Sequence, residues 1–406
     1  MLTKSIKRVD YINYFILIYA FILSFPVALK TPIIVLLIIF WLTDKNRFNS
    51  NFIKMNHIFL MMGIFLFYII ISSIWSEANA KEILVSIKKY WYYLPMFIIY
   101  KYIKKEYILY TISSFLVGMF ISELLSYGVI FSFWEIRHAT AANPSIFLHH
   151  IQYSIFLSLT SIILFFKAIY ETKRNVQILY FLFFITVTLN LFLNVGRTGY
   201  ITFLVSIFLS LIVVYKLKKQ IIITTFIALV SIITLAYNFS PNFKIRTYQG
   251  IEDIQQLTQE GKYNTSIGSR FALWIVAKEI FIKNPILGVG VANHIHTKNE
   301  FAKMMFNNNF KFLLNIKHFH NSFLEILTQF GIIGLSIFLY ILYLLFKIPI
   351  KDKKIKIFKI SILSIFILGS FTDRLFYINS TISLFALIFG LILAQYKIEE
   401  ESNALQ

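Results

Sequence analysis

The run HIFLMMGIFLFYIIISSIW, residues His57–Trp75, contains no Lys, Arg, Asp or Glu. A helix of about 20 apolar residues crosses the hydrocarbon core of a bilayer, so this run predicts a transmembrane helix. Comparable runs recur along the chain and predict an all-α polytopic membrane protein of about twelve spans. The second and fourth runs are short, which leaves open tilted or partly re-entrant segments. In order, the runs are Tyr11–Leu29, Thr31–Leu42, His57–Trp75, Trp91–Ile103, Ile108–Phe133, His150–Ile169, Gln177–Val195, Thr198–Tyr215, Ile221–Tyr237, Phe330–Phe346, Ile357–Phe371 and Asn379–Tyr396.

The composition of the chain supports a membrane protein. Of its 406 residues, 58% are hydrophobic and 14% are charged, whereas soluble domains are about 45–50% apolar and about 25% charged. The net charge of +20 comes from basic residues in short clusters between the apolar runs, so it does not indicate a nucleic-acid partner. Membrane lipids are the expected surroundings. Since the chain has no cysteine, it has neither a disulfide nor a thiolate metal site.

The basic clusters also predict the orientation in the membrane. Lysines and arginines gather in alternate connections, such as residues 101–105, 216–219 and 347–359. Cytoplasmic loops of multi-pass proteins carry this excess, so both termini are predicted to lie in the cytoplasm. The stretch Lys81–Tyr90 has the pattern of a short amphipathic helix at the membrane interface.

One connection is far longer than the others. Residues 238–320 lie outside the cytoplasm in this topology and are mostly polar. Within them, Ser269–Ile282 has apolar residues on one helical face, and Pro285 ends that helix because it pushes the preceding residue out of the helical region. We therefore expect a folded helical cap. The predicted parts are residues 1–237 with transmembrane helices 1–9, the loop 238–320 with the active-site residues, and residues 321–406 with helices 10–12 and a cytoplasmic tail.

Two arginines are expected on the outer side. Arg197 lies in the short turn Gly196–Gly199 between two spans, where an arginine is costly without an anionic partner. The alternative is a side chain that extends to lipid headgroups or backbone carbonyls. Arg270 lies at the start of the loop helix, which Ser266 or Ser269 could cap, and the free N–H groups there favour an anion. An arginine can bind phosphate in a bidentate way, and the alternative is an ordinary exposed side chain.

The segment KHFHN, residues 317–321, lies where the loop re-enters the membrane. A histidine has a pKa of about 6.5, so at an interface that faces a polar cavity it is a natural general base. Either His318 or His320 could be this base. The alternative is a capping or structural histidine.

A polar stripe follows these histidines. Asn321, Glu325 and Gln329 share one helical face. Near membrane depth such a stripe should face protein or water rather than lipid.

Several enzyme classes lack their motifs in this sequence. It contains no phosphate-binding loop ending in Lys-Ser/Thr, no HExxH helix, no paired-aspartate metal motif and no G-x-S-x-G turn. Nucleotide hydrolysis, zinc proteolysis and serine hydrolysis are therefore unsupported.

The remaining motifs resemble the signature of the bacterial O-antigen ligase family, within the wider O-antigen ligase and polymerase superfamily. His-Asn, nine residues and Gly-x-x-Gly cover residues 320–334. GSRFALW at 268–274 is similar to a Gly-x-Arg-x-x-x-Trp/Tyr helix, and NPILGVG follows it at 284–290. GRTGY at 196–200 is similar to the family's arginine turn, with glycine where Thr or Ser is frequent. The later pair Asp373-Arg374 resembles an Asp-Arg pair at an outer helix turn.

This resemblance implies a GT-C-type glycosyltransferase of the bacterial inner membrane, active in lipopolysaccharide biosynthesis on the periplasmic face. It implies an undecaprenyl-diphosphate-linked glycan as donor, lipid A–core as acceptor, and an inverting transfer that uses neither metal nor cofactor. Arg197 and Arg270 would bind the diphosphate, and His320 would take the proton of the acceptor hydroxyl. Supporting roles would fall to His318, Asn321, Asp373 and Arg374.

Three alternatives remain open. An O-antigen or capsule polymerase uses the same lipid-linked donor, and a protein O-oligosaccharyltransferase is a third enzyme of the wider group. A polysaccharide transporter or flippase is the alternative from another class. Transporters often show two related halves and helices broken by Gly or Pro near mid-membrane, and the sequence indicates neither.

Overall fold

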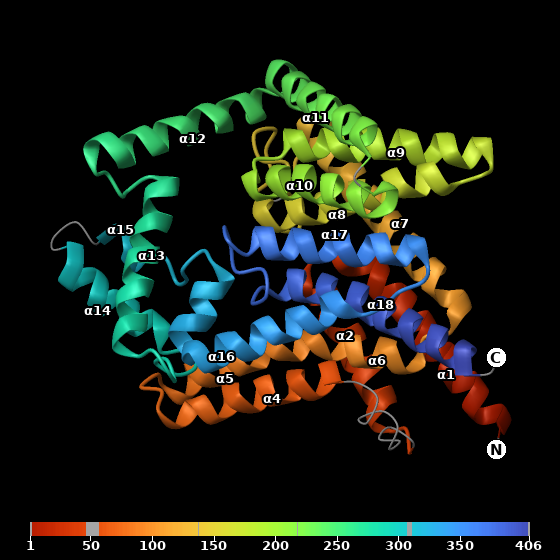
Figure 1. Cartoon of the computed structure of the whole chain (residues 1–406), viewed down its shortest axis with the longest axis horizontal. Helices are drawn as coiled ribbons and strands as arrows, with labels where there is room; N and C mark the ends of the chain where they lie inside the picture. The colour runs from red at the N-terminus through yellow and green to blue at the C-terminus, as the bar shows by residue number, and fades with distance from the viewer. Residues whose placement is uncertain (1, 46–56, 137, 217, 307–310, 405–406) are drawn as a thin grey trace.

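The computed structural model describes residues 2–45, 57–136, 138–216, 218–306 and 311–404 (Figure 1). These described residues form helices joined by turns and contain no β-strand, with one isolated bridge between Thr140 and Asn143. The predicted all-α class is therefore confirmed.

The helices form a bundle and an outer group. Both chain ends lie at one end of the bundle, and the outer group lies at the opposite end (Figure 1). The outer group consists of α12 (Pro241–Glu260), α13 (Ser266–Lys283), α14 (His294–Phe306) and α15 (Lys311–Leu314). The bundle consists of α1 (Leu2–Phe21), α2 (Val27–Leu42), α4 (His57–Ile71), α5 (Ala80–Lys88), α6 (Leu94–Tyr102), α7 (Lys105–Ile130), α8 (His150–Tyr170), α9 (Arg174–Leu193), α10 (Arg197–Tyr215), α11 (Lys219–Phe239), α16 (Ser322–Lys347), α17 (Lys353–Gly369) and α18 (Asn379–Ala404).

Among the described residues, 8 helices are long and apolar enough to cross a membrane. They are α4 with the 3-10 turn that follows it, α7, α8, α9, α10, α11, α16 and α18. Four further helices in the described part of the chain offer shorter stretches than these spans. The apolar parts of α1 and α2 are too short to be counted with them, α6 has 9 residues and α17 has 17 residues. A multi-pass membrane protein is thus supported. The count of twelve spans and the cytoplasmic side of the termini remain predictions.

The boundaries predicted for the first two spans were wrong. Tyr11–Leu29 is not a single helix, because α1 ends at Phe21 and Phe25 is extended, with φ −90° and ψ 176°. Pro26 explains the break, since proline forces the preceding residue out of the helical region. Helix α2 starts directly after Pro26 rather than at Thr31.

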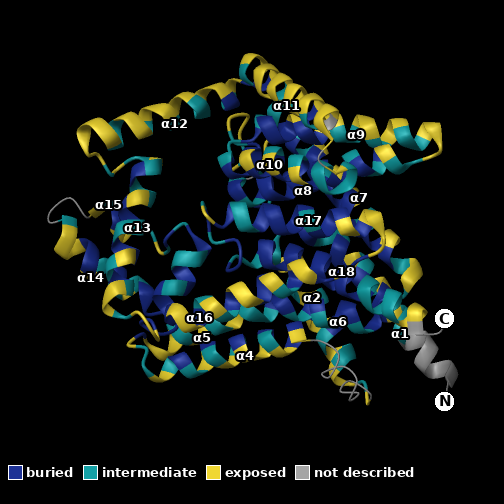
Figure 2. Ribbon diagram, viewed as in Figure 1, coloured by how far each residue is buried: buried dark blue, intermediate teal, exposed yellow. Residues whose placement is uncertain are grey.

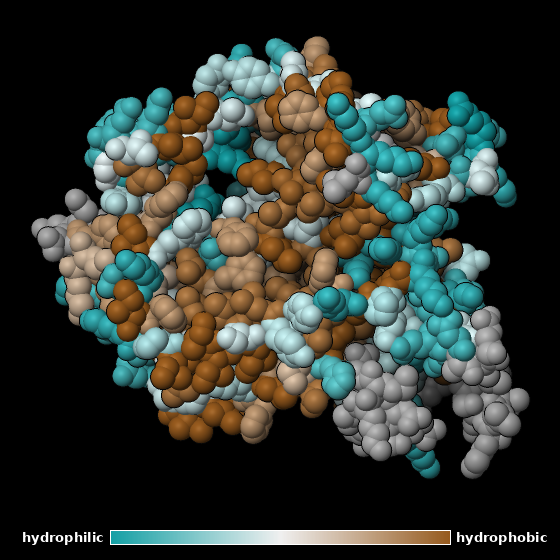
Figure 3. Space-filling view, in the orientation of Figure 1, coloured by the Kyte–Doolittle hydropathy of each residue, from teal (hydrophilic) through white to brown (hydrophobic). Residues whose placement is uncertain are grey.

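Burial is uneven across the bundle (Figure 2). In α8 and α18, 78% of the apolar window is buried, compared with 28% in α9 and 11% in α11. Figure 3 shows hydrophobic surface along α4 and α16 as well. Apolar helix faces of this extent fit lipid rather than water.

The outer helices have a small hydrophobic core of their own. Leu273, Val276 and Ile280 of α13 pack in one cluster with Phe301 of α14 and with Phe319. This core seats α13 at the end of the bundle.

The start of α13 differs from the prediction. Thr265 caps the helix, and its Oγ1 accepts a hydrogen bond of 3.0 Å from Gly268 N. Capping by Ser266 or Ser269 was therefore a wrong prediction, because both residues already lie inside the helix, whereas Thr265 has the extended backbone of a cap. The predicted end before Pro285 is confirmed.

A glycine-rich segment connects the outer helices to α16. Three backbone hydrogen bonds of 2.9 Å join residues 285–290 to residues 328–332. They accompany a break in α16 at Gly331, which has φ 61° and ψ −164°. The sequence indicated no helix broken by glycine, so this break corrects that prediction. Helix α16 also starts at Ser322, earlier than the predicted Phe330.

Candidate functional site

The turn that joins α17 to α18 is bonded to three other parts of the fold. Ser322 N donates to Ser370 O at 2.8 Å, at the start of α16. Thr198 Oγ1 and Thr372 Oγ1 share a hydrogen bond of 2.8 Å, and Arg270 Nε donates to Thr372 O at 3.4 Å. The turn therefore brings together the N-terminal parts of α10, α13 and α16, which carry the predicted site residues.

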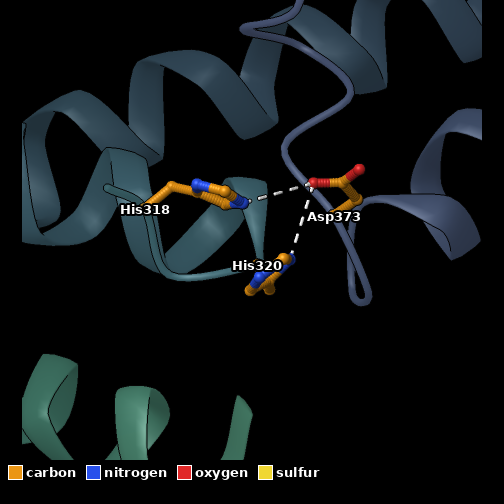
Figure 4. Close-up of side chains that lie close together, drawn as sticks. All are labelled: His318, His320 and Asp373. Carbon is orange, nitrogen blue, oxygen red and sulfur yellow. Dashed lines mark ion pairs between the residues drawn. The ribbon is translucent and has the colours of Figure 1, made fainter. Parts of the chain in front are cut away.

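Two histidines face one carboxylate of this turn (Figure 4). His320 Nδ1 lies 3.8 Å from Asp373 Oδ1, and His318 Nε2 lies 4.0 Å from the same oxygen. The centroids of the two imidazole rings are 4.1 Å apart. The buried Asp373 Oδ1 also accepts a hydrogen bond of 2.8 Å from Arg374 N. The structure thus brings together three of the predicted residues from two separate parts of the sequence.

The backbone at His320 is unusual. His320 has φ 50°, a left-handed conformation that costs a residue with a side chain about 1–2 kcal/mol. Residues in such conformations cluster at functional sites. The next residue, Asn321, caps α16, since its Oδ1 accepts hydrogen bonds from Phe323 N at 2.9 Å and Leu324 N at 3.1 Å. Asn321 therefore fixes the start of α16 beside His320.

Burial and nearby cations keep both histidines neutral. Burial, followed by the charges of Arg270 and Arg374, lowers the pKa of His320 to about 3. Burial, followed by Arg374, lowers the pKa of His318 to about 2. Burial raises the pKa of Asp373, and the Arg374 N–H group and the two arginine charges oppose that rise. At pH 7 both rings are in the form that accepts a proton, and His320 Nε2 is the nitrogen turned away from Asp373.

The two predicted arginines interact electrostatically, and Arg270 also acts on His320. Arg270 Nη1 donates to Ser266 O at 2.8 Å and to Ser266 Oγ at 3.1 Å. Arg197 Nη1 lies 3.5 Å from Asp253 Oδ2 of α12, and this buried nitrogen has no hydrogen-bond partner among the described residues. Burial lowers the pKa of Arg270, and the charge of Arg197 acts in the same direction.

Further cationic groups surround Tyr377. Arg374 Nη1 lies 3.5 Å from Glu325 Oε1, and its guanidinium lies 5.4 Å from the centroid of the Tyr377 ring. Lys89 Nζ lies 4.0 Å from the same centroid. His294 Nε2 lies 3.6 Å from Glu325 Oε1.

The predicted polar stripe of Asn321, Glu325 and Gln329 is buried inside the protein, as expected.

A cavity of about 470 Å³ opens beside these groups. Its walls include His318, His320, Asp373, Arg374 and Lys89. An apolar pocket adjoins it, because Arg374 lines both. The apolar pocket is otherwise lined mainly by α4, the turn 89–93, α16 and the turn between α17 and α18. A polar cavity beside an apolar pocket fits a lipid with a charged headgroup.

Sequence reasoning missed three residues of this region. Lys89 was seen only as part of an interface helix, although burial, followed by Arg374, lowers its pKa to about 8. The pair His149-His150 directly before an apolar run was a usable signal, and His149 lines the cavity. His294 gave no signal in sequence, because its burial against Glu325 depends on the folded loop.

His318, His320 and Asp373 could also be considered as metal ligands. Each offers one ligand atom, and these atoms lie within 4.8 Å of one another. Around a tetrahedral zinc ion the ligand atoms are roughly 3.3 Å apart. The charges of Arg270 and Arg374 act on the same groups and oppose a cation there. The residues present therefore fit a proton-accepting centre better than a metal centre.

Comparison with known families gives a match for part of the chain. The family model described as O-antigen ligase matches residues 181–339, which run from within α9 to within α16. The matched region contains Arg197, Arg270 and His320, whereas Lys89 and Asp373 lie outside it. None of the curated proteins matches the chain as a relative. The family match supports the resemblance found in the sequence motifs of residues 181–339.

Proposed function

We propose that this chain is a member of the O-antigen ligase and polymerase superfamily and a GT-C-type glycosyltransferase of the bacterial inner membrane, as the family match over residues 181–339 supports. It would transfer an O-antigen glycan from undecaprenyl diphosphate to lipid A–core on the periplasmic face. The observation that carries this proposal is a neutral His320 that faces Asp373 and is acted on by the charges of Arg270 and Arg374. The adjoining apolar pocket would hold an acyl or prenyl chain.

The proposed step is a direct displacement at the anomeric carbon of the donor. The acceptor hydroxyl oxygen forms the new bond to this carbon, and His320 Nε2 takes the hydroxyl proton. The bond between the anomeric carbon and the diphosphate oxygen breaks, and the diphosphate leaves with the electron pair. Arg197 and Arg270 would stabilise the charge that develops on it. A single displacement inverts the configuration at this carbon.

Donor binding would itself activate His320. With a pKa of about 3, His320 is a weak base in the free protein. A bound diphosphate would offset the charges of Arg270 and Arg374, which are among the groups that lower this pKa. The nearby carboxylate of Asp373 would stabilise the imidazolium that forms. In this scheme arginines supply the positive charge and no metal is needed.

Transfer by the purified full chain, with lipid-linked glycan and lipid A–core, tests the proposal. His320→Ala should reduce the rate by about 10²–10⁴, the usual contribution of general acid–base catalysis. His296→Ala is the matched control, because the His296 side chain is 53% exposed and lies on α14. Transfer by His320→Ala at the rate of the control would exclude His320 as the base.

A polymerase is the second candidate, because the superfamily includes both activities and the same site would bind the same donor. Purified protein given donor alone separates the two: longer glycan on undecaprenyl diphosphate identifies a polymerase. In cells, loss of a ligase leaves the core without polymer, whereas loss of a polymerase leaves the core with a single repeat unit.

Two further candidates can be tested in the same assay. A glycosidic bond formed by the purified protein excludes a pure transporter, and transfer to peptide would identify a protein O-oligosaccharyltransferase. Transporters use broken helices to build a substrate path. The break of α16 at Gly331 is instead occupied by residues 285–290.

A further inference from the structure

Helix α12 lies directly against Arg197. Arg246, Gly250 and Asp253 are spaced so that they share one face of α12. Asp253 Oδ2 lies 3.5 Å from Arg197 Nη1, and a Cβ on Gly250 would lie 3.6 Å from the same nitrogen. Because Gly250 has no side chain, Arg197 can approach α12 closely. Arg246 lies one helical turn from Gly250 on the same face of α12.

Arg246 has no structural ion pair that would explain its position. Its Nη1 donates to Gln249 Oε1 at 2.9 Å, and Gln249 belongs to the same helix. Among the residues that the structure describes, no carboxylate lies within 4.0 Å of its guanidinium nitrogens. Burial, followed by the charge of Arg197, lowers the pKa of Arg246. A second guanidinium is thus partly withdrawn from water beside the first.

Arg197, Arg246 and Arg270 carry more positive charge than the neighbouring carboxylates offset. The charge of Arg197 acts on both Arg246 and Arg270, and the carboxylates that act on Arg246 and Arg270 are Asp253 and Asp373. Asp253 Oδ2 also accepts a hydrogen bond of 3.3 Å from the backbone N–H of residue 267. Asp373 already faces two histidines. Like charges held together and partly desolvated are costly unless an anion offsets them.

We infer that Arg246 is a further phosphate-binding residue, which forms with Arg197 and Arg270 a three-arginine site for the diphosphate of the lipid-linked donor. This inference rests on the proposed function. The three guanidiniums come from α10, α12 and α13, so they can surround an anion from different directions. The diphosphate gains negative charge as it leaves, and the third guanidinium increases the stabilisation of that charge. Figure 3 shows a hollow between α12 and the bundle, bordered by hydrophilic and hydrophobic residues.

Binding of inorganic pyrophosphate to the purified full chain tests the site without any glycan transfer. Arg246→Gln should raise the Kd about tenfold, which corresponds to about 1.4 kcal/mol. The matched control is Lys244→Gln, because Lys244 is an exposed cation of the same helix, and its Kd should stay within about twofold of wild type. Arg246→Lys should give an intermediate Kd, since it keeps the charge but loses the bidentate geometry.

Kinetics with both substrates then identify the source of the phosphate. Arg246→Gln should raise the KM of the donor about tenfold and leave the KM of lipid A–core unchanged. Equal pyrophosphate affinities for wild type and Arg246→Gln would overturn the inference. A rise in the KM of lipid A–core alone would overturn the assignment to the donor. If the wild type bound pyrophosphate through Arg246 yet transferred no glycan, the proposed function would fail while the three-arginine site stood.

Discussion

Replacing Gly331 by alanine should strongly destabilise the junction between the outer helices and α16. Gly331 has φ 61° and ψ −164°, a region that residues with a side chain occupy at a cost of about 1–3 kcal/mol. The added Cβ would lie 2.1 Å from Ile286 O, so residues 285–290 would have to move. The three backbone hydrogen bonds to residues 328–332 would then be lost, at about 0.5–1.5 kcal/mol each. The free energy of unfolding should fall by about 2.5–7.5 kcal/mol in total.

Unfolding of the purified protein in one detergent measures this loss. Gly63→Ala is the matched control, because Gly63 lies in α4, and an added Cβ would have no atom within 4 Å apart from its own stretch of helix backbone. Alanine is the better helix former, so the control should be unchanged or more stable by up to about 1 kcal/mol. If Gly331→Ala unfolded like Gly63→Ala, the packing of residues 285–290 against the break in α16 would not contribute to stability.

Three further predictions concern the site. Since the pKa of His320 in the free protein is about 3, the pH profile of kcat/KM should show no loss of activity near pH 6.5. The profile of kcat should lose activity at a higher pH than the profile of kcat/KM, because bound diphosphate raises the pKa of His320. A loss of activity near pH 6.5 in both profiles would contradict the assigned environment of His320. Chelation with EDTA should leave the transfer rate unchanged, and a loss that zinc restores would instead assign His318, His320 and Asp373 to a metal. Thr198→Val should lower the free energy of unfolding by about 1 kcal/mol, because the hydroxyl of Thr372 loses its hydrogen bond to Thr198 but keeps its hydrogen bond to Gly369 O. A stability equal to that of wild type would show that the bond between the two threonines contributes nothing.

The sequence was most informative where a local pattern decides the local structure. Apolar runs without charges, such as His57–Trp75, predicted helices because lipid leaves a spanning chain few other conformations. Pro285 correctly predicted the end of α13. Pro26 likewise indicated a helix end in the first predicted span, but the apolar run continues across Pro26, so a single span was predicted there.

The site was only partly predictable, because it depends on contacts between distant segments. The motifs singled out Arg197, Arg270 and His320, and the structure shows that the turn after α17 connects the helices that carry them. Nothing in the local sequence of Thr372 indicates that it bonds to both α10 and α13. Arg246 was not singled out, because a lone arginine on a polar helix resembles any exposed cation until α12 is placed against Arg197.

The most direct test of the whole account is an experimental structure of the protein with undecaprenyl diphosphate bound. We predict phosphate oxygens within about 3 Å of guanidinium nitrogens of Arg197 and Arg270, with the imidazole of His320 facing the terminal phosphate. A diphosphate bound at the opposite end of the bundle, near the chain termini, would contradict the assignment of the site.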